Sequence, residues 1–253
     1  MPISRLELKL RAQAVMRSSK PSAIRVGLLY ILLTIVMSLL SARILSSNVD
    51  YNQILEHIQS GNPEYAMAYL SKYAPSPSAY LIDLALQIIR CIVDVGFVIF
   101  LLNSIRNTGA CYGNLLDGFG MFGRIILLNL LQGIFIFLWS LLFVVPGIIA
   151  AYRYRQAVYI LIDHPEKSAL DCIRESKRLM NGRKAELFML DLSFIGWTLA
   201  SGIAIIGWFV SIWSVPYINM TYALYYEYLA GHIVRQLGND PFSQFNNPGN
   251  SSF

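Results

Sequence analysis

The chain of 253 residues is 55% hydrophobic and only 14% charged, and its mean hydropathy of +0.50 lies above the range usual for soluble proteins. Several apolar runs of about 20 residues can be accommodated together only by a bilayer, so the composition excludes an ordinary soluble domain. The formal net charge of +5 does not indicate nucleic-acid binding, because the basic residues gather at the ends of apolar runs and form no stripe interleaved with aromatic residues.

The first predicted element is a surface helix over residues 3–16. Apolar residues recur at helical spacing on one face and basic residues lie elsewhere: Ile3, Leu6, Leu10 and Ala14 against Arg5, Lys9 and Arg11. We expect the basic face to meet anionic lipid headgroups. Lys20-Pro21 marks a corner, after which residues 23–45 are long enough to span the membrane.

Polar residues 46–78 form the predicted outer loop, and residues 80–103 form the second span. The glycine-rich stretch 113–123 has no Gly-Lys-Ser/Thr and follows a span instead of a strand. It therefore predicts a tight connection with a short interfacial helix rather than a phosphate-binding loop.

The remaining sequence predicts four more crossings. Spans over 124–144 and 147–162 are separated by a sharp turn at Pro146, and spans over 187–213 and 217–234 by a break at Pro216. Between these pairs, residues 165–185 read as an amphipathic cytoplasmic helix that stops at Asn181-Gly182. Residues 238–253 are expected to be a disordered cytoplasmic tail.

The distribution of Lys and Arg decides the predicted topology. With six spans, Arg43 and Lys72 are the basic residues left outside, whereas most others fall on the cytoplasmic side. This predicts a multi-pass protein of a bacterial cytoplasmic membrane with both termini cytoplasmic. Similar short motifs at 121–124 and 180–183 indicate an internal repeat. The predicted fold is all-α: one integral membrane domain over residues 1–237, with six transmembrane helices in three hairpins, each preceded by a short interfacial amphipathic helix.

Several stretches resemble a known family: Phe143-Val-Val-Pro-Gly-Ile148, Tyr152-Arg-Tyr154, residues 169–180 with Ser176-Lys177, and Asp191-Leu-Ser-Phe-Ile-Gly-Trp197. They look like a bacterial membrane family known as domain of unknown function 975, and the likeness extends over most of the chain. The resemblance implies a multi-span membrane protein and brings no activity, substrate or catalytic residue. A weaker likeness of hairpin architecture links the chain to membrane domains of some glycerophosphodiester phosphodiesterases, whose hydrolase part has no counterpart here.

Ionisable residues inside predicted spans are the main functional signal, because a charge at mid-bilayer is costly unless it is paired or hydrated. Three spans each present a polar face, and the candidate ligand or ion-pathway residues are Asp83, Gln87, Arg90 and Asp94 in the second span, Tyr152, Arg153, Arg155 and Tyr159 in the fourth, and Asn219, Tyr222 and Glu227 in the sixth. Arg90 and Asp94 have the spacing of an ion pair within one helix. These faces predict either a pathway or pocket for an ion or an anionic amphiphile, or a charge-compensated network that only fixes helix register.

No catalytic motif accompanies these residues. The sequence lacks a Gly-x-Ser-x-Gly elbow, a Cys/His nucleophile pair, a Walker sequence and a zinc-binding helix, and its three cysteines have no metal-type spacing. We therefore predict a protein that is not an enzyme, has no cofactor and binds no metal. Gly196, Ala200 and Ala204 form a small-residue stripe that fits packing within the chain or, as an alternative, a homo-oligomer interface.

Two functions remain from the sequence. In the first, the protein binds or moves an ion or an anionic amphiphile, or protects the envelope, through the polar faces of the second, fourth and sixth spans. In the second, it is a membrane scaffold whose basic interfacial helices recruit a partner or anionic lipid headgroups. In both, the lipid bilayer is the main partner and nucleic acid is not.

Overall fold

The computed structural model describes residues 4–46, 51–61, 63–72, 74–203 and 206–231, and within these ranges it is all-helical, with no strand. The all-α prediction is confirmed. In chain order the elements are α1 (Arg5–Ser18), α2 (Ala23–Ser46), α3 (Tyr51–Gln59), α4 (Pro63–Lys72), α5 (Pro77–Arg106), α6 (Asn114–Asp117), the 3-10 helix η1 (Gly118–Met121), α7 (Phe122–Leu142), α8 (Val144–Tyr154), α9 (Ala157–Asp163), α10 (Ala169–Leu179), α11 (Lys184–Leu192), α12 (Ile195–Ser201) and α13 (Ile206–Leu229).

Three helical stretches among the described residues are long and apolar enough to cross a membrane: α2, α5 and the run Asn114–Leu142 that contains α6, η1 and α7. Large aliphatic side chains on them point away from the protein, such as Leu39 of α2, which is 65% exposed, and Leu141 of α7, which is 73% exposed. Lipid accommodates such side chains without the cost that water would impose. The expected membrane character of the chain therefore has direct structural support.

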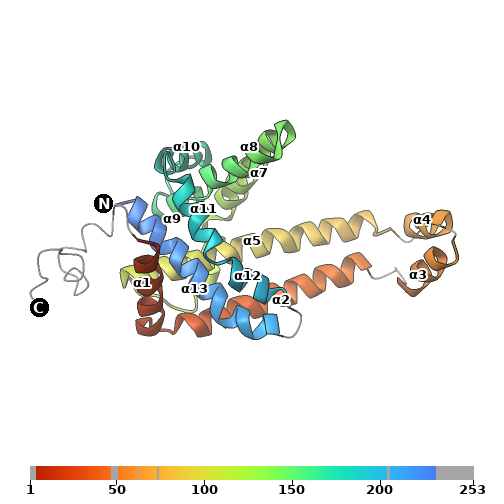
Figure 1. Ribbon diagram of the computed structural model, residues 1–253, viewed down its shortest axis with the longest axis horizontal. Helices are drawn as coiled ribbons and strands as arrows, with labels where there is room; N and C mark the ends of the chain where they lie inside the picture. The colour runs from red at the N-terminus through yellow and green to blue at the C-terminus, as the bar shows by residue number, and fades with distance from the viewer. Residues whose placement is uncertain (1–3, 47–50, 62, 73, 204–205, 232–253) are drawn as a thin grey trace, which may run out of the picture.

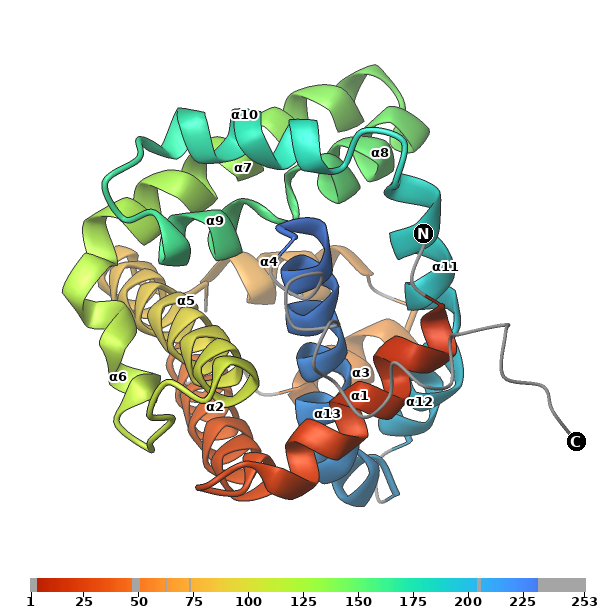
Figure 2. The ribbon, with the colours of Figure 1, turned by 90° about the vertical axis from the view of Figure 1, so that its left-hand side faces the viewer.

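Figure 1 shows α2 and α5 lying side by side as a long pair that projects beyond the other helices, with α3 and α4 at its far end. A second pair is formed by α7 and α8, and α12 packs against α13. Helix α1 lies across the opposite end of the molecule, in front of α13 in Figure 2.

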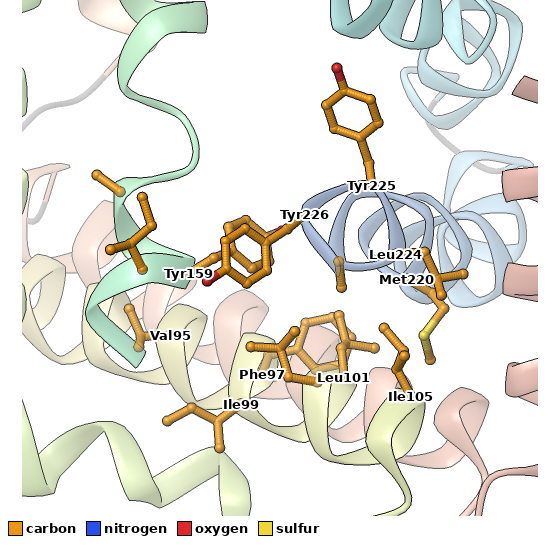
Figure 3. Packing of buried hydrophobic residues seen from close by; sticks show 14 of the residues in the cluster. Val95, Phe97, Ile99, Leu101, Ile105, Tyr159, Met220, Leu224, Tyr225 and Tyr226 are labelled. Carbon is orange, nitrogen blue, oxygen red and sulfur yellow. The ribbon is translucent and has the colours of Figure 1, made fainter. Parts of the chain in front are cut away.

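The core lies where α5 packs against α13, as Figure 3 shows. Phe97 and Leu101 of α5 face Met220 and Leu224 of α13, and all four side chains are buried. Lipid tails are as apolar as these side chains, so close packing rather than removal from water stabilises contacts at membrane depth.

Two glycines allow α5 and the following short helices to approach closely. A side chain on Gly96 of α5 would collide with the carbonyl oxygen of Leu115, and one on Gly118 would collide with the carbonyl oxygen of Ile92. Each of the two segments thus has a glycine where the backbone of the other comes close, and the glycine-rich stretch packs tightly against α5. This agrees with the tight connection predicted for it.

The turn predicted at Pro146 lies three residues earlier. Helix α7 ends at Leu142, Phe143 is extended with φ −162° and ψ 152°, and α8 begins at Val144. Pro146 thus lies in the first turn of α8, where its missing N–H has no helical acceptor to lose. A side chain on Gly147 would collide with Ser140, so the glycine lets α8 fold back closely on α7.

The break predicted at Pro216 is wrong, because α13 continues through this residue from Ile206 to Leu229. A Cβ atom on Gly27 of α2 would lie 3.0 Å from the Pro216 ring, so the proline occupies space that the glycine leaves free. The break in this part of the chain lies before α13, where α12 ends at Ser201 and Gly202 follows.

Two predicted spans are interrupted in the structure. The fourth, 147–162, consists of α8 and α9 with a turn at Arg155 and Gln156 between them. The fifth, 187–213, is divided among α11, α12 and the start of α13. A helix of the length of α8 rises only about 17 Å, well short of the hydrocarbon core of about 30 Å. The end of the sixth predicted span and the tail at 238–253 lie outside the described residues.

The amphipathic helix predicted over 165–185 is present as the shorter α10, Ala169–Leu179. Ser168 caps its N-terminus by accepting a hydrogen bond from the backbone N–H of Asp171, and Ala169, Cys172, Ile173 and Ser176 are buried. Gly182, with φ +75°, provides the predicted stop, since this conformation strains any residue with a Cβ.

Candidate functional site

A polar cluster centred on Asp191 joins three helices, and we call it the Asp191 cluster (Tyr152, Arg155, Asp191 and Tyr222). The Asp191 carboxylate accepts hydrogen bonds from the Tyr152 hydroxyl at 2.8 Å, the Tyr222 hydroxyl at 2.7 Å and Nη1 of Arg155 at 2.6 Å. These groups come from α11, from α8 and the turn that follows it, and from α13. The Arg155 guanidinium also lies 4.2 Å from the centre of the Tyr222 ring, a cation–π distance.

A second polar cluster, the Arg106 cluster (Arg106, Asp163, Tyr226 and Glu227), joins the ends of α5, α9 and α13. Arg106 donates to both oxygens of Asp163, at 2.7 and 2.9 Å, and through Nε to Glu227 at 2.8 Å. The Tyr226 hydroxyl donates to Asp163 at 2.6 Å, and its ring stacks on Tyr159 with centroids 5.0 Å apart. The bidentate geometry is the strong form of an arginine–carboxylate pair.

The predicted polar stripe of the second span contacts α2 instead of the fourth and sixth spans. Asp83 accepts a hydrogen bond from the Ser41 hydroxyl, and Asp94 accepts one from the Tyr30 hydroxyl at 2.9 Å. Gln87 and Arg90 are exposed. Among the described residues Arg90 forms no hydrogen bond or ion pair, so the pair expected with Asp94 is not formed.

Arg90 instead lines a groove of about 550 Å³, which we call the Arg90 groove. Its walls are Leu28 and Leu32 of α2 and Trp208, Ser211 and Ile212 of α13. Asp94 is not among the residues that line it, but Tyr30, which is, donates a hydrogen bond from its hydroxyl to Asp94. The groove is mainly apolar and contains one charged side chain.

The remaining predicted residues have local partners. Asn219 donates to the carbonyl oxygen of Val215 in its own helix at 2.9 Å. Arg153 is half-buried, and its carbonyl oxygen accepts a hydrogen bond from Ser176 of α10 at 2.8 Å. The first contact lies within α13, and the second joins the backbone of α8 to α10.

The structure thus divides the predicted polar interior into separate parts. Tyr152, Arg155 and Tyr222 meet at Asp191, and Glu227 joins the Arg106 cluster, against which Tyr159 stacks. Among the described residues, no hydrogen bond or ion pair links either cluster to the second-span residues Asp83, Gln87, Arg90 and Asp94.

Sequence reasoning did not nominate Asp191 or Arg106, the central residues of the two clusters. Asp191 lies inside a predicted span, and an intramembrane carboxylate is itself a functional signal. Arg106 lies in the last turn of α5, where a basic residue is also typical of the cytoplasmic end of a span. Its partners Asp163 and Glu227 are separated from it by 57 and 121 positions, so no local pattern indicates them.

The chemistry of both clusters is that of charge compensation. Each arginine faces carboxylates that neutralise it, and no group of His, Cys, Asp and Glu suited to a metal ion occurs among the described residues. The Arg90 groove differs, because its guanidinium faces an apolar cavity without a carboxylate on its wall.

Comparison of the chain with known proteins gives one family. Residues 141–232, which include α8 to α13, match the family described as "Protein of unknown function (DUF975)". No curated protein and no solved structure matches the chain. The comparisons do not show the weaker likeness to membrane domains of glycerophosphodiester phosphodiesterases, and the family match is shorter than the extent expected from the sequence. Residues 141–232 thus carry the DUF975 family match, and the resemblance stated from the sequence is confirmed for this part of the chain.

Proposed function

We propose that the protein is a non-enzymatic, multi-pass membrane protein that takes an anionic amphiphile from the bilayer into the Arg90 groove. In this proposal the chain crosses a bacterial cytoplasmic membrane six times with both termini in the cytoplasm. The shorter helices α8 with α9, and α11 with α12, complete the crossings as broken segments packed against their neighbours. Broken helices are tolerated at membrane depth where protein surrounds the interrupted backbone.

The position of basic and apolar residues supports this orientation. Exposed Arg174 and Arg178 lie on α10, at the same end of the molecule as α1, and the apolar turn Phe143–Val144–Val145 lies at the tip of the α7 and α8 pair. Lys and Arg are retained on the cytoplasmic side of bacterial membranes. The end that carries α1 and α10 is therefore the proposed cytoplasmic end.

Native cysteines allow a test of this orientation. Cys111, in the connection between α5 and α6, is exposed, whereas Cys172 is buried. Burial raises the pKa of the Cys172 thiol, which slows its reaction because the thiolate is the nucleophile. A membrane-impermeant maleimide is expected to label Cys111 in inside-out vesicles and not in intact cells, and the Cys111→Ser variant should lose the label. Labelling of Cys111 in intact cells would reverse the proposed orientation.

The single observation that carries the binding proposal is the Arg90 guanidinium, which lies near the midpoint of α5 and faces an apolar groove. A charged arginine at the centre of a membrane helix costs about 2.5–3.5 kcal/mol on insertion scales. An anionic headgroup in the groove offsets this cost through charge-assisted hydrogen bonds. The amphiphile supplies both the anion and the apolar chain that the groove requires.

The walls of the groove fit the apolar chain of such an amphiphile. Leu28, Leu32 and Ile212 offer aliphatic surface, and Ser211 and Thr34 add hydroxyl groups beside it. Leu28, Leu32 and Trp208 are themselves exposed on the outer surface, so the groove is open towards the lipid. A bilayer amphiphile can therefore enter sideways without opening the helix bundle.

Trp208 provides a reporter for this site. We would keep it as the sole tryptophan (Trp139→Phe, Trp197→Phe and Trp213→Phe) in full-length protein in phosphatidylcholine nanodiscs, and titrate brominated phosphatidylglycerol. Arg90→Gln is expected to weaken the apparent affinity for this anionic lipid by about tenfold, which is about 1.4 kcal/mol and close to the lower end for a hydrogen bond to a charged group.

Arg124→Gln is the matched control, since Arg124 is an exposed arginine of α7 that does not line the groove. It should leave the quenching curve unchanged, and brominated phosphatidylcholine should quench wild-type and Arg90→Gln protein alike. Equal phosphatidylglycerol quenching in wild-type and Arg90→Gln protein would refute anion recognition by Arg90.

The alternative function, a scaffold that recruits a partner or anionic lipid through basic helices, draws support from α10. Its Arg174 and Arg178 side chains are 76% and 80% exposed. If the protein is a scaffold, the Arg90→Gln variant should still recruit its partner. If its activity depends on the Arg90 groove, the same variant should lose that activity.

A further inference from the structure

Helix α1 has two apolar faces, one buried and one exposed. Leu8, Ala12 and Met16 follow one another at four-residue spacing and are buried against the bundle. On another side Leu6 is 68% exposed and Leu10 is 53% exposed, and Ala14 continues the same spacing. Leu6, Leu10 and Ala14, which belong to the apolar face predicted for a surface helix, are thus exposed, and the helix packs on the bundle through Leu8, Ala12 and Met16.

The buried contacts fix the orientation of α1, so the exposed leucines cannot turn inward. Lys9 donates from Nζ to the carbonyl oxygen of Ser193 at 3.2 Å, at the C-terminus of α11, and lies 4.3 Å from the centre of the Phe194 ring. Helix α1 also contacts α13, which it crosses in Figure 2. The face formed by Leu6, Leu10 and Ala14, which we call the outer α1 face, therefore stays exposed, and Leu6 at its end also borders a hollow between α1 and α11.

The covalent connection places this face beside the point where α2 enters the membrane. Helix α1 ends at Ser18 and α2 begins at Ala23, so only a short corner separates them. In the first turn of α2, Ile24 and Arg25 are exposed. A helix tied so closely to the end of a membrane span lies at the depth of the lipid headgroups.

The charges around the outer α1 face identify the surface that it fits. Arg5 and Arg17 on α1 and Lys20 and Arg25 after it are exposed. Glu7 is the one acidic residue in the sequence from 4 to 25, and it pairs with Arg11 at 3.1 Å. A pair of exposed leucines bordered by basic residues is complementary to anionic headgroups with acyl chains beneath them.

We propose that the outer α1 face inserts Leu6 and Leu10 into the headgroup region of the leaflet in which α2 begins, with Arg5 and Arg17 contacting anionic phospholipids. This contact is separate from the Arg90 groove, since it lies at the end of the bundle and involves no groove residue. It anchors α1 in the plane of the membrane and, through Lys9, holds the C-terminal end of α11 against the bundle.

The test uses the full-length protein in nanodiscs with a fluorophore on Leu10→Cys in a Cys111→Ser background. Nanodiscs contain phosphatidylcholine with or without phosphatidylglycerol, and the quenchers are aqueous iodide and a lipid with a shallow spin label. Adding phosphatidylglycerol is expected to lower iodide quenching at residue 10 about twofold or more and to raise quenching by the spin-labelled lipid, as insertion at the headgroup level requires.

Two variants serve as controls. A fluorophore on Thr108→Cys, in the exposed connection after α5, should remain accessible to iodide in both lipid mixtures. Arg5→Gln with Arg17→Gln should remove the effect of phosphatidylglycerol at residue 10. Iodide quenching at residue 10 equal to that at residue 108 in anionic nanodiscs would overturn the proposal, and so would a disulfide between residues 10 of two copies, which would assign this face to a protein contact.

Discussion

Replacing Arg106 by glutamine is expected to lower the free energy of unfolding by about 3–5 kcal/mol, the usual cost of removing one partner from a buried ion pair. Arg106 is hydrogen-bonded to Asp163 and Glu227, whose side chains are only 9% and 3% exposed. Without the guanidinium, two carboxylates remain close together in a poorly hydrated site. The Arg106 cluster joins α5, α9 and α13. The loss of stability should therefore appear as cooperative destabilisation in denaturant or thermal unfolding of the purified protein.

Two variants separate this effect from a general effect of losing an arginine. Arg106→Lys keeps the positive charge but loses the forked geometry that binds both Asp163 oxygens, so it should be intermediate. Arg124→Gln removes an exposed arginine and should change stability by no more than about 0.5 kcal/mol. If Arg106→Gln and Arg124→Gln are equally stable, the Arg106 cluster does not hold the helices together.

The sequence was most informative where a helix depends on its own residues. Apolar length predicts α2, α5 and α7, and the amphipathic pattern with Gly182 as its stop predicts α10. These features are determined within a few turns of the chain, by the solvent around the helix and by local backbone preference.

The errors arose where a contact across the fold decides the outcome. Helix α13 continues through Pro216, and the proline ring packs against Gly27 of α2, which is far away in the sequence. Asp94 bonds to Tyr30, 64 positions away, instead of pairing with Arg90 one turn away. Periodicity shows which residues share a helix face, but it cannot show which helix that face will meet.

The arginines of the predicted spans and their ends differ in how their charge is compensated. Arg106 and Arg155 face carboxylates, so they need no ligand to be stable at their depth. Arg90 faces an apolar groove, and no described carboxylate binds it. The contacts of the two clusters are those of a network that fixes helix positions, and this contrast supports our proposal that ligand recognition belongs to the second span.

The Asp191 cluster should show strong coupling in a double-mutant cycle. Asp191→Asn is expected to lower the free energy of unfolding by about 2–3 kcal/mol, because Arg155 loses its counter-charge and two tyrosine hydroxyls lose a charged acceptor. Arg155→Leu should cost a similar amount.

The double variant Asp191→Asn with Arg155→Leu should be more stable than the sum of the two single losses predicts, by about 1–3 kcal/mol, since neither charge is then left without its partner. Glu166→Gln, at an exposed carboxylate, should be nearly neutral. Additive losses in the cycle would show that Arg155 and Asp191 do not depend on each other. Phosphatidylglycerol quenching of Trp208 should be unchanged in Asp191→Asn protein that remains folded, because a network that only positions helices affects stability without contacting the ligand.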